Sequence, residues 1–261
     1  MRNYKQNHEL LWQLTRREIY GRYQGSALGV LWAWIAPLLM LAVYTFVFGV
    51  VFTSRWAHAE GGGLTVALNI FCGLITFNIF GETCQRSATA ITANPNYVKK
   101  VVFPLEVIPL TIVGAGLFHA ALSYLILILV TASSPLAVHP TVILLPLVVV
   151  PVTFFALGAA WILSSLGVYL RDTAQIVPVG VSALLFMSPI FYPLSALPAK
   201  AQPVLELNPF TIMVEGSRAL VFEGTIPDLH PLAIVWAFSI VWAYLGYCWF
   251  MKTKKGFADV I

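Results

Sequence analysis

The sequence predicts an all-α integral membrane protein with six transmembrane helices, an N-terminal amphipathic interface helix, a short cytoplasmic helix and short re-entrant helices on the external side. Of the 261 residues, 59% are hydrophobic and only 10% are charged, whereas a soluble domain has about 25% charged residues. The apolar residues form runs close to the roughly 20 residues that a helix needs to cross a bilayer. The runs lack the two-residue alternation of barrel strands, so the backbone polar groups must be satisfied within helices.

Six apolar runs are the predicted spans. They are Ala27–Phe52, Leu64–Gly81, Val107–Val130, Val142–Leu170, Ile176–Tyr192 and Leu232–Met251. We therefore divide the chain into an interface helix over residues 1–26 and a six-helix membrane domain over residues 27–261. An even number of spans places both termini on the same side.

The basic residues predict which side that is. One side of this topology carries twelve of them, namely Arg2, Lys5, Arg16, Arg17, Arg22, Arg86, Lys99, Lys100, Arg171, Lys252, Lys254 and Lys255. The other side carries only Arg55, Lys200 and Arg218. Because cytoplasmic loops are enriched in Lys and Arg, both termini are predicted to be cytoplasmic. The net charge of +4 then follows from topology, and no nucleic-acid partner is needed to explain it.

The N-terminal residues have the pattern of an amphipathic helix. Leu10, Leu11, Leu14 and Ile19 recur near helical spacing, and charged residues occupy the remaining surface. Such a helix lies in the membrane interface. It is either a plain anchor or a surface that also contacts a partner or a lipid head group.

Residues 82–106 form the longest predicted cytoplasmic loop. Asn94 can cap a short helix that begins at Pro95, where the missing N–H of proline is no loss. A helix displayed between two spans suits docking, although a solvated basic loop has the same composition. Arg171 and Asp172 directly follow the fourth span and mark its cytoplasmic end, with or without a role in docking.

Residues 188–231 differ from the rest of the chain in their many prolines and in apolar stretches too short to span. Short apolar pieces at the external face indicate re-entrant or interfacial helices. We expect this segment to form the external gate. Its acidic residues, Glu206, Glu215, Glu223 and Asp228, are equally typical of a solvated cap.

Several kinds of chemistry are missing from the sequence. It has no G-x-x-x-x-G-K-[ST] phosphate loop, so any ATP hydrolysis must come from a partner chain, and the five histidines have no metal-ligand spacing. Only His119 lies within a predicted span, and no Lys or Arg lies in the middle of one. Since proton- and ion-coupled pumps place ionisable groups there, secondary transport is disfavoured.

Four motifs, in order along the chain, resemble one known family. Residues 16–29 with Trp32 and Pro37 are similar to its R-D-x-x-x-R-Y-x-x-S-x-L-G-x-x-W…P signature, with Glu18 in place of aspartate. Residues 94–106 are similar to its N-x-x-L-V-K-K-x-x-F-P-x-E loop, with Tyr97 in place of leucine. The others are a group with Arg171-Asp172, Ser188 to Pro193, Asn208-Pro209, Glu215 and Arg218, and the C-terminal run Lys254 to Val260. The chain thus resembles the permease subunits of type-2 ABC exporters for O-antigen, capsule and teichoic acid.

The resemblance implies a homodimeric permease in a bacterial inner membrane that carries two copies of a separate ATPase subunit. ATP and Mg would bind to that partner, and this chain would bind no cofactor and catalyse no reaction. The cargo would be a surface polysaccharide on a polyprenyl pyrophosphate or another lipid carrier. The residues 82–106 would then be a coupling loop, and the ATPase-coupling residues would be Asn94, Pro95, Tyr97, Lys99, Lys100, Arg171 and Asp172.

Two further groups are candidates for substrate contact. A lipid pyrophosphate is anionic and would bind cations at the cytoplasmic interface, where Arg16, Arg17 and Arg22 are placed. Sugar rings stack on aromatic side chains, so Trp32, Trp34, Tyr44, Phe48, Phe186, Phe191 and Tyr192 are candidates for the glycan path. Aromatic residues packed against lipid or other helices are the commoner case.

Two other functions fit less well. A type-2 permease for a drug or a small lipid is disfavoured by the polysaccharide-type motifs. A membrane enzyme that acts on lipid-linked sugars would need convergent carboxylates or histidines at the membrane face, and the sequence has no D-x-D motif or histidine cluster.

Overall fold

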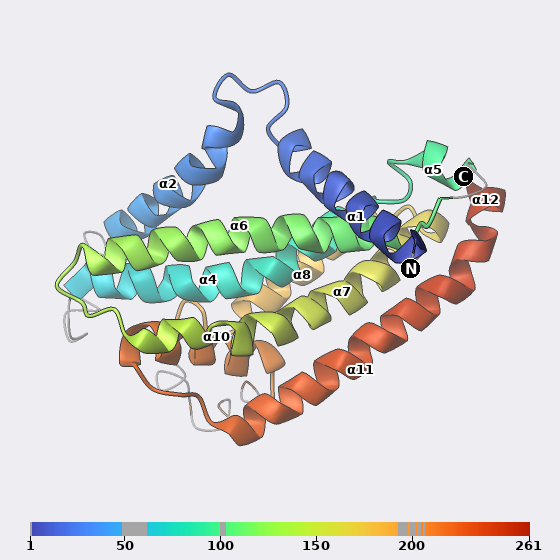
Figure 1. Cartoon of the computed structure of the whole chain (residues 1–261). Helices are drawn as coiled ribbons and strands as arrows, with labels where there is room; N and C mark the ends of the chain where they lie inside the picture. Colours follow the sequence, from blue (N-terminus) through green and yellow to red (C-terminus); the bar gives the residue numbers. More distant parts are fainter. Residues whose placement is uncertain are drawn as a thin grey trace.

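The computed structural model describes residues 2–48, 62–99, 103–192 and 207–261, together with residues 198, 202 and 205. Within these ranges every regular element is helical (Figure 1). Five stretches are long and apolar enough to cross a membrane, namely Gly29–Phe46, Gly62–Ser87, Val107–Ala132, Pro140–Tyr169 and Leu229–Val260. The prediction of an all-helical fold with several membrane spans is confirmed.

The predicted fifth span is shorter than expected. Instead of Ile176–Tyr192, the structure has helix α8, Thr173–Phe186, of 14 residues. Such a helix rises about 21 Å, less than the roughly 30 Å of a hydrocarbon core. Pro189 limits the helix, because the residue before a proline is pushed out of the helical region. The count of six spans therefore stays a prediction.

Helix α4, Gly62–Ser87, lies at the centre of the bundle. It contacts α2 (Trp32–Phe46), α6 (Val107–Ala132), α7 (Pro146–Tyr169) and α8. Every residue from Phe71 to Phe77 is buried, as expected of a helix that is covered on all sides. The helix extends beyond the predicted end at Gly81, because the polar residues that follow form ion pairs with Glu18 of the N-terminal helix and with Arg22 just after it.

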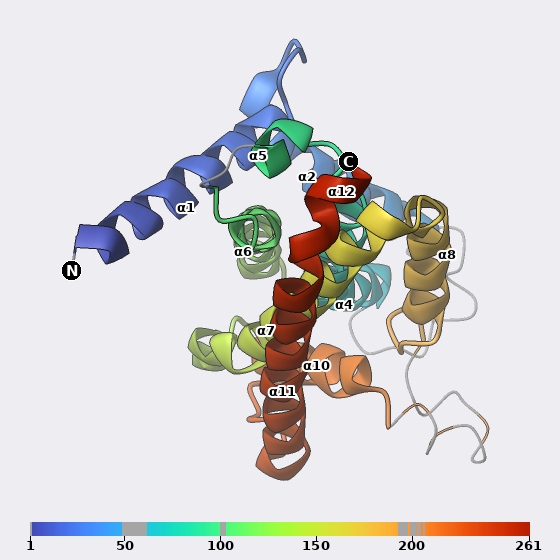
Figure 2. The ribbon, with the colours of Figure 1, turned by 90° about the vertical axis from the view of Figure 1, so that its right-hand side faces the viewer.

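Helix α11, Leu229–Thr253, packs along α7, as Figure 2 shows. The two backbones touch at Gly158 and Gly246. A Cβ atom at Gly246 would lie 2.4 Å from the carbonyl oxygen of Gly158. Small residues at such a crossing are what allow two membrane helices to approach closely.

The N-terminal helix α1, Arg2–Gly21, ends before the predicted boundary at residue 26 and lies against α6. Its position at the membrane interface stays a prediction. Its approach is close, since a Cβ at Gly114 would lie 2.9 Å from the side chain of Thr15. Turns and the 3-10 helix η1, Gly29–Leu31, connect it to α2. In Figure 1, α1 and α2 slope away from the bundle to this connection.

The proline-rich segment, residues 188–231, contains short helices, and their place on the external side stays a prediction. Among the described residues of 188–231 these are α10, Pro209–Arg218, and the π-helical turn η5, Ala219–Glu223; the 3-10 helix η3, Pro140–Leu144, lies beside η5. Thr76 of α4 is bonded to Tyr124 OH of α6 at 2.7 Å and to Ser217 Oγ of α10 at 2.9 Å, and all three are buried. This polar group ties α10 to two spans; the depth of α10 in the membrane stays a prediction.

Candidate functional site: the cytoplasmic junction and the cavity beside it

The short helix α5, Pro95–Lys99, begins at the predicted proline. Arg17 Nη1 of α1 donates a hydrogen bond to Tyr97 OH at 2.5 Å, and its guanidinium lies 5.6 Å from the centre of the Tyr97 ring. That ring stacks on Phe103 with 4.2 Å between centroids, and Asn94 Nδ2 donates to the carbonyl of Ala90. The structure thus places Arg17, a predicted lipid-contact residue, in contact with Tyr97, a predicted coupling residue. Lys100 lies outside the described residues.

The other two N-terminal arginines lie differently. Arg22 forms an ion pair with Glu82 of α4, and Arg86, one turn further along α4, forms one with Glu18 of α1. Arg86 Nη1 also lies 3.7 Å from Glu82 Oε1. These four residues, two arginines and two glutamates, form a network that fixes α1 to α4. Arg16 is exposed, with its guanidinium 5.5 Å from the ring of Tyr20.

The network separates two cavities. One, of about 300 Å³, lies between α1 and the predicted loop over residues 82–106, and Arg17, Glu18, Arg86, Asn94 and Tyr97 line part of it. The other, of about 230 Å³, lies between α2, α4 and α6, and Arg22 and Glu82 line part of it. We call them the loop cavity and the span cavity. A change in the ion pairs would therefore alter the walls of both.

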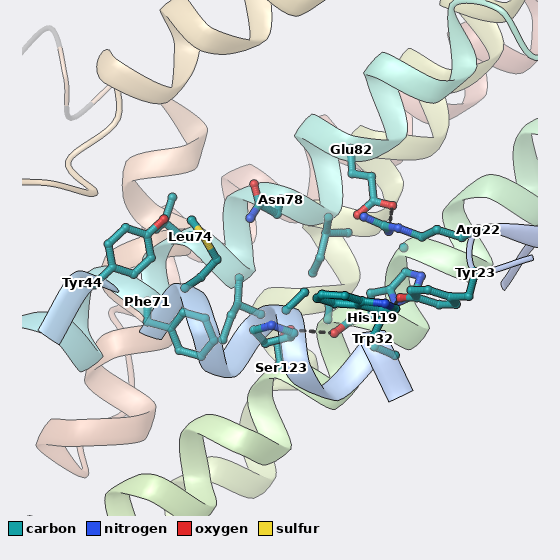
Figure 3. Close-up of a pocket in the computed structure, with 18 residues that line it drawn as sticks. Arg22, Tyr23, Trp32, Tyr44, Phe71, Leu74, Asn78, Glu82, His119 and Ser123 are labelled. Carbon is teal, nitrogen blue, oxygen red and sulfur yellow. Dashed lines mark hydrogen bonds and ion pairs between the residues drawn. The ribbon is translucent and has the colours of Figure 1, made fainter. Parts of the chain in front are cut away.

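The span cavity has a polar end and an apolar end (Figure 3). Arg22, Glu82, Tyr23 and His119 lie at the polar end beside the indole of Trp32. Tyr44, Phe71 and Leu74 lie at the other end. An amphipathic cavity of this kind suits a ligand with a polar group joined to an apolar chain.

Tyr23 and His119 join the α1–α2 connection to the middle of α6. Tyr23 OH and His119 Nδ1 are 3.3 Å apart, and the rings meet edge to face. Burial raises the pKa of the Tyr23 phenol, with a smaller opposing effect from Arg22, so the phenol stays neutral. His119 Nε2 is buried without a hydrogen-bond partner among the described residues. The side-chain partner of His119 therefore lies in the turn that follows α1.

The candidate glycan-path aromatics fall into separate groups. Trp32 and Tyr44 line the span cavity. Phe186, Phe191 and Tyr192 cluster at the end of α8, where Phe186 and Phe191 are 5.7 Å apart and Tyr192 OH donates to the Phe186 carbonyl. Trp34 is exposed on α2, and Phe48 packs against the core. The structure does not bring these seven residues together within one chain.

Arg171 and Asp172 are exposed in the turn between α7 and α8. Asp172 stands directly before α8, but its side chain makes no capping hydrogen bond. In the described part of the chain no hydrogen bond or ion pair joins them to α5.

Arg218 is one of the three basic residues predicted to lie on the external side. Its side chain is buried, with only 7% exposed. Its guanidinium donates to the carbonyls of Asn69, Pro189 and Ile190 and to the carboxylate of Glu215, at 2.8 to 3.1 Å. It therefore joins α10 to the start of α4 and to the segment after α8. A Cβ at Gly73 would lie 3.1 Å from its Nη2, so the glycine leaves room for it.

The comparisons with known proteins agree on one family. Residues 9–222 match the model of the ABC-2 type transporter family. The O-antigen export system permease protein RfbA of Myxococcus xanthus is 31% identical over 100% of this chain and 98% of its own length. The protein of the same name from Klebsiella pneumoniae is 28% identical, with 97% and 95% covered. The polysialic acid transport protein KpsM of Escherichia coli is 27% identical, with 89% of each chain covered.

Proposed function

Because this chain belongs to the ABC-2 type transporter family, we propose that it is the membrane-spanning subunit of an exporter that moves a lipid-linked surface polysaccharide across a bacterial inner membrane. The observation that carries the substrate class is the similarity to O-antigen and polysaccharide permeases, which extends over nearly the whole chain. The span cavity supports it, because its polar and apolar ends suit a carrier lipid with a polar head.

The energy would come from two copies of a partner ATPase that binds ATP and Mg. The hydrogen bond from Arg17 of α1 to Tyr97 of α5 joins the two helices. This contact supports a single docking surface for that partner. The test is co-purification with a candidate ATPase, followed by ATP hydrolysis that rises when the lipid-linked glycan is added to proteoliposomes. A complex that hydrolyses ATP without moving glycan would contradict the proposed substrate.

A homodimer completes the proposal. Helix α8 exposes a face that includes Ile176 and Val179, 66% and 70% exposed. An apolar helix face that is this exposed is covered either by lipid or by a second copy of the chain. Two copies would bring the aromatic clusters of α8 around one path.

The proposed topology places both termini and α5 in the cytoplasm and the α6–α7 connection outside. We expect cysteine at Ala137, in that connection, to react with an impermeant maleimide in intact cells, in a background without the native cysteines. Cysteine at Lys99 should react only after the membrane is opened. The reverse pattern would contradict the topology.

The contact between Arg17 and Tyr97 is expected to couple ATP hydrolysis to export. Tyr97→Phe removes the hydroxyl but keeps the ring on Phe103, and should lower glycan export per ATP hydrolysed by about fivefold, the equivalent of one hydrogen bond. Arg17→Gln should have a similar effect. The double variant should be no worse than either single one, because both remove the same bond. Independent, multiplying effects would show that the two residues act separately.

The arginines and aromatics keep their proposed substrate roles. Arg16 is free to approach a lipid phosphate from the exposed face of α1, whereas Arg17 and Arg22 would first have to leave Tyr97 and Glu82. Trp32 and Tyr44 would contact the substrate in the span cavity.

Photo-crosslinking tests the glycan path. A photoreactive residue at Trp32, Tyr44 or Phe191 is expected to crosslink to glycan during export, since a sliding polymer needs rigid aromatic contacts without deep binding. Phe238, which is exposed on α11, is the matched control and should capture phospholipid. Capture of phospholipid alone at the first three positions would exclude them from the path.

A further inference from the structure

The C-terminal segment, residues 254–261, turns back from the last long helix onto the cytoplasmic end of the bundle. It consists of the 3-10 helix η6, Lys254–Gly256, and the helix α12, Phe257–Val260. Both Figure 1 and Figure 2 show α12 beside α5, and the two are in contact. A helix of four residues has no stability of its own, so its position depends on what it buries.

The residue that anchors it is Phe257, which is 0% exposed. Its ring packs edge to face on Phe250 of α11, with 5.5 Å between centroids, and lies 5.9 Å from the ring of Tyr169 of α7. These side chains belong to a hydrophobic cluster separate from the main core, which we call the cytoplasmic cluster. Its buried members are Ala90, Ile91, Leu105, Ile108, Ile112, Trp161, Val168, Phe250 and Phe257.

The coupling helix packs on the same cluster. Tyr97 and Val98 of α5, and Phe103 after it, are partly buried against it, as is Ile261 at the C-terminus. Residues of the 82–106 loop and residues of the C-terminal segment therefore pack in the same small core. A displacement of α5 must deform this core or move α12 with it, because packed interiors transmit displacement and do not absorb it.

Polar contacts hold the segment at a second point. Lys254 Nζ lies 3.0 Å from Glu106 Oε2, at the end of the coupling loop. Trp161 Nε1 donates to the backbone carbonyl of the same Glu106, and Tyr169 OH donates to the carbonyl of Thr253. The segment approaches α7 closely here, since a Cβ at Gly256 would lie 2.7 Å from Tyr169 OH.

The coupling helix has only five residues and is held from two sides. Arg17 of α1 holds Tyr97 from one side, and the cytoplasmic cluster with Phe257 supports it from the other. We propose that the C-terminal segment positions the coupling helix α5 and passes its movement to α11, with Phe257 and Lys254 as the positioning residues. This inference rests on the proposed function in one respect, namely that a partner ATPase displaces α5.

A movement of α5 that is passed to α11 would also affect the membrane domain. Because α11 and α7 are in backbone contact at Gly246 and Gly158, movement of the C-terminal end of α11 acts on the α7–α11 pair. The N-terminal helix and the last span would thus receive the same signal at opposite faces of α5. A permease that lacked the segment would bind its ATPase but respond to it poorly.

A charge exchange tests the ion pair in the reconstituted complex of permease and ATPase. Lys254→Glu and Glu106→Lys are each expected to lower glycan export per ATP hydrolysed by about fivefold or more, and the double variant should recover to within about twofold of the parent. Lys255→Glu, an exposed neighbour with the same charge change, should stay within about twofold. A double variant as poor as the single ones would overturn the assignment of Lys254.

A second measurement tests Phe257 without reference to the substrate. Cysteine at Asn96, an exposed residue of α5 with no proposed coupling role, reports the exposure of the coupling helix through its rate of reaction with a maleimide, with and without ATP. Phe257→Ala should raise the rate without ATP and abolish the response to ATP, Phe257→Leu should keep most of the response, and Val260→Ala, on the exposed face of the same helix, should resemble the parent. An unchanged response in Phe257→Ala would overturn the proposal. If the parent complex responds to ATP but moves no glycan, the proposed substrate fails while this test still stands.

Discussion

Replacing Arg86 by glutamate is expected to lower export by about a hundredfold, a larger effect than any other single change among the residues that join the N-terminal segment to α4 and α5. In the parent, Arg86 lies between Glu18 of α1 and Glu82 of the same helix. The variant would place three carboxylates together at a partly buried site and would leave Arg22 as the nearest cation. Repulsion of this kind costs about 3 kcal/mol. We expect α1 to detach from α4, which opens the wall between the loop cavity and the span cavity.

The measurement is export per permease molecule in membranes, with abundance determined in parallel. Exchanging the charges, in Glu18→Arg with Arg86→Glu, should recover a substantial part of the activity because the ion pair between α1 and α4 is formed again. Arg86→Lys, which keeps the charge but loses the planar donor fork, should lie between the two. Near-normal export by Arg86→Glu would show that the network does not hold α1 in place.

The sequence was informative about elements whose cause is local. The proline at position 95 predicted the start of α5, and the periodicity of Leu10, Leu11 and Leu14 predicted α1. The short helix α10 was expected from the spacing of prolines, and Asn208 caps it by accepting from Phe210 N. Turns and helix caps depend on residues only a few positions apart, so the local sequence predicts them.

The ends of the spans were less predictable because tertiary contacts decide them. A hydropathy pattern ends α4 at its last apolar residue, Gly81, whereas Glu82 and Arg86 continue the helix because α1 supplies partners for their charges. The spacing of Glu82 and Arg86 by one helical turn was the signal available in the sequence. Nothing in the linear pattern could indicate that their partners lie on the N-terminal helix.

The candidate site was predicted in its parts but not in its arrangement. Arg17 and Tyr97 were both singled out, for separate roles, and the structure joins them. Tyr23, Glu82 and His119 were not expected to form one end of a cavity. Tyr23 and His119 are 96 positions apart, and a contact at such a separation depends on how the helices pack, which no local rule contains.

The buried Arg218 illustrates the same limit, and its replacement is expected to destabilise the protein most. The guanidinium satisfies three backbone carbonyls and Glu215 from one buried position. Arg218→Ala would leave the buried carbonyls of Pro189 and Ile190 without this donor. Each unsatisfied buried acceptor costs about 1–3 kcal/mol, so these two account for about 2–6 kcal/mol.

Such a loss corresponds to a fall of roughly 10 °C in the thermal unfolding midpoint of the detergent-solubilised permease, measured by a fluorescence or aggregation assay. Arg218→Lys should recover only part of it, because one ammonium cannot reach acceptors spread over α4, α10 and the segment after α8 in the way that the forked guanidinium does. Glu215→Gln should be milder than Arg218→Ala, since the carbonyl contacts of Arg218 remain, and Arg16→Ala, at an exposed arginine, is the control. If Arg218→Ala unfolds at the same temperature as this control, the buried arginine does not join α10 to the bundle and its contacts serve some purpose other than stability.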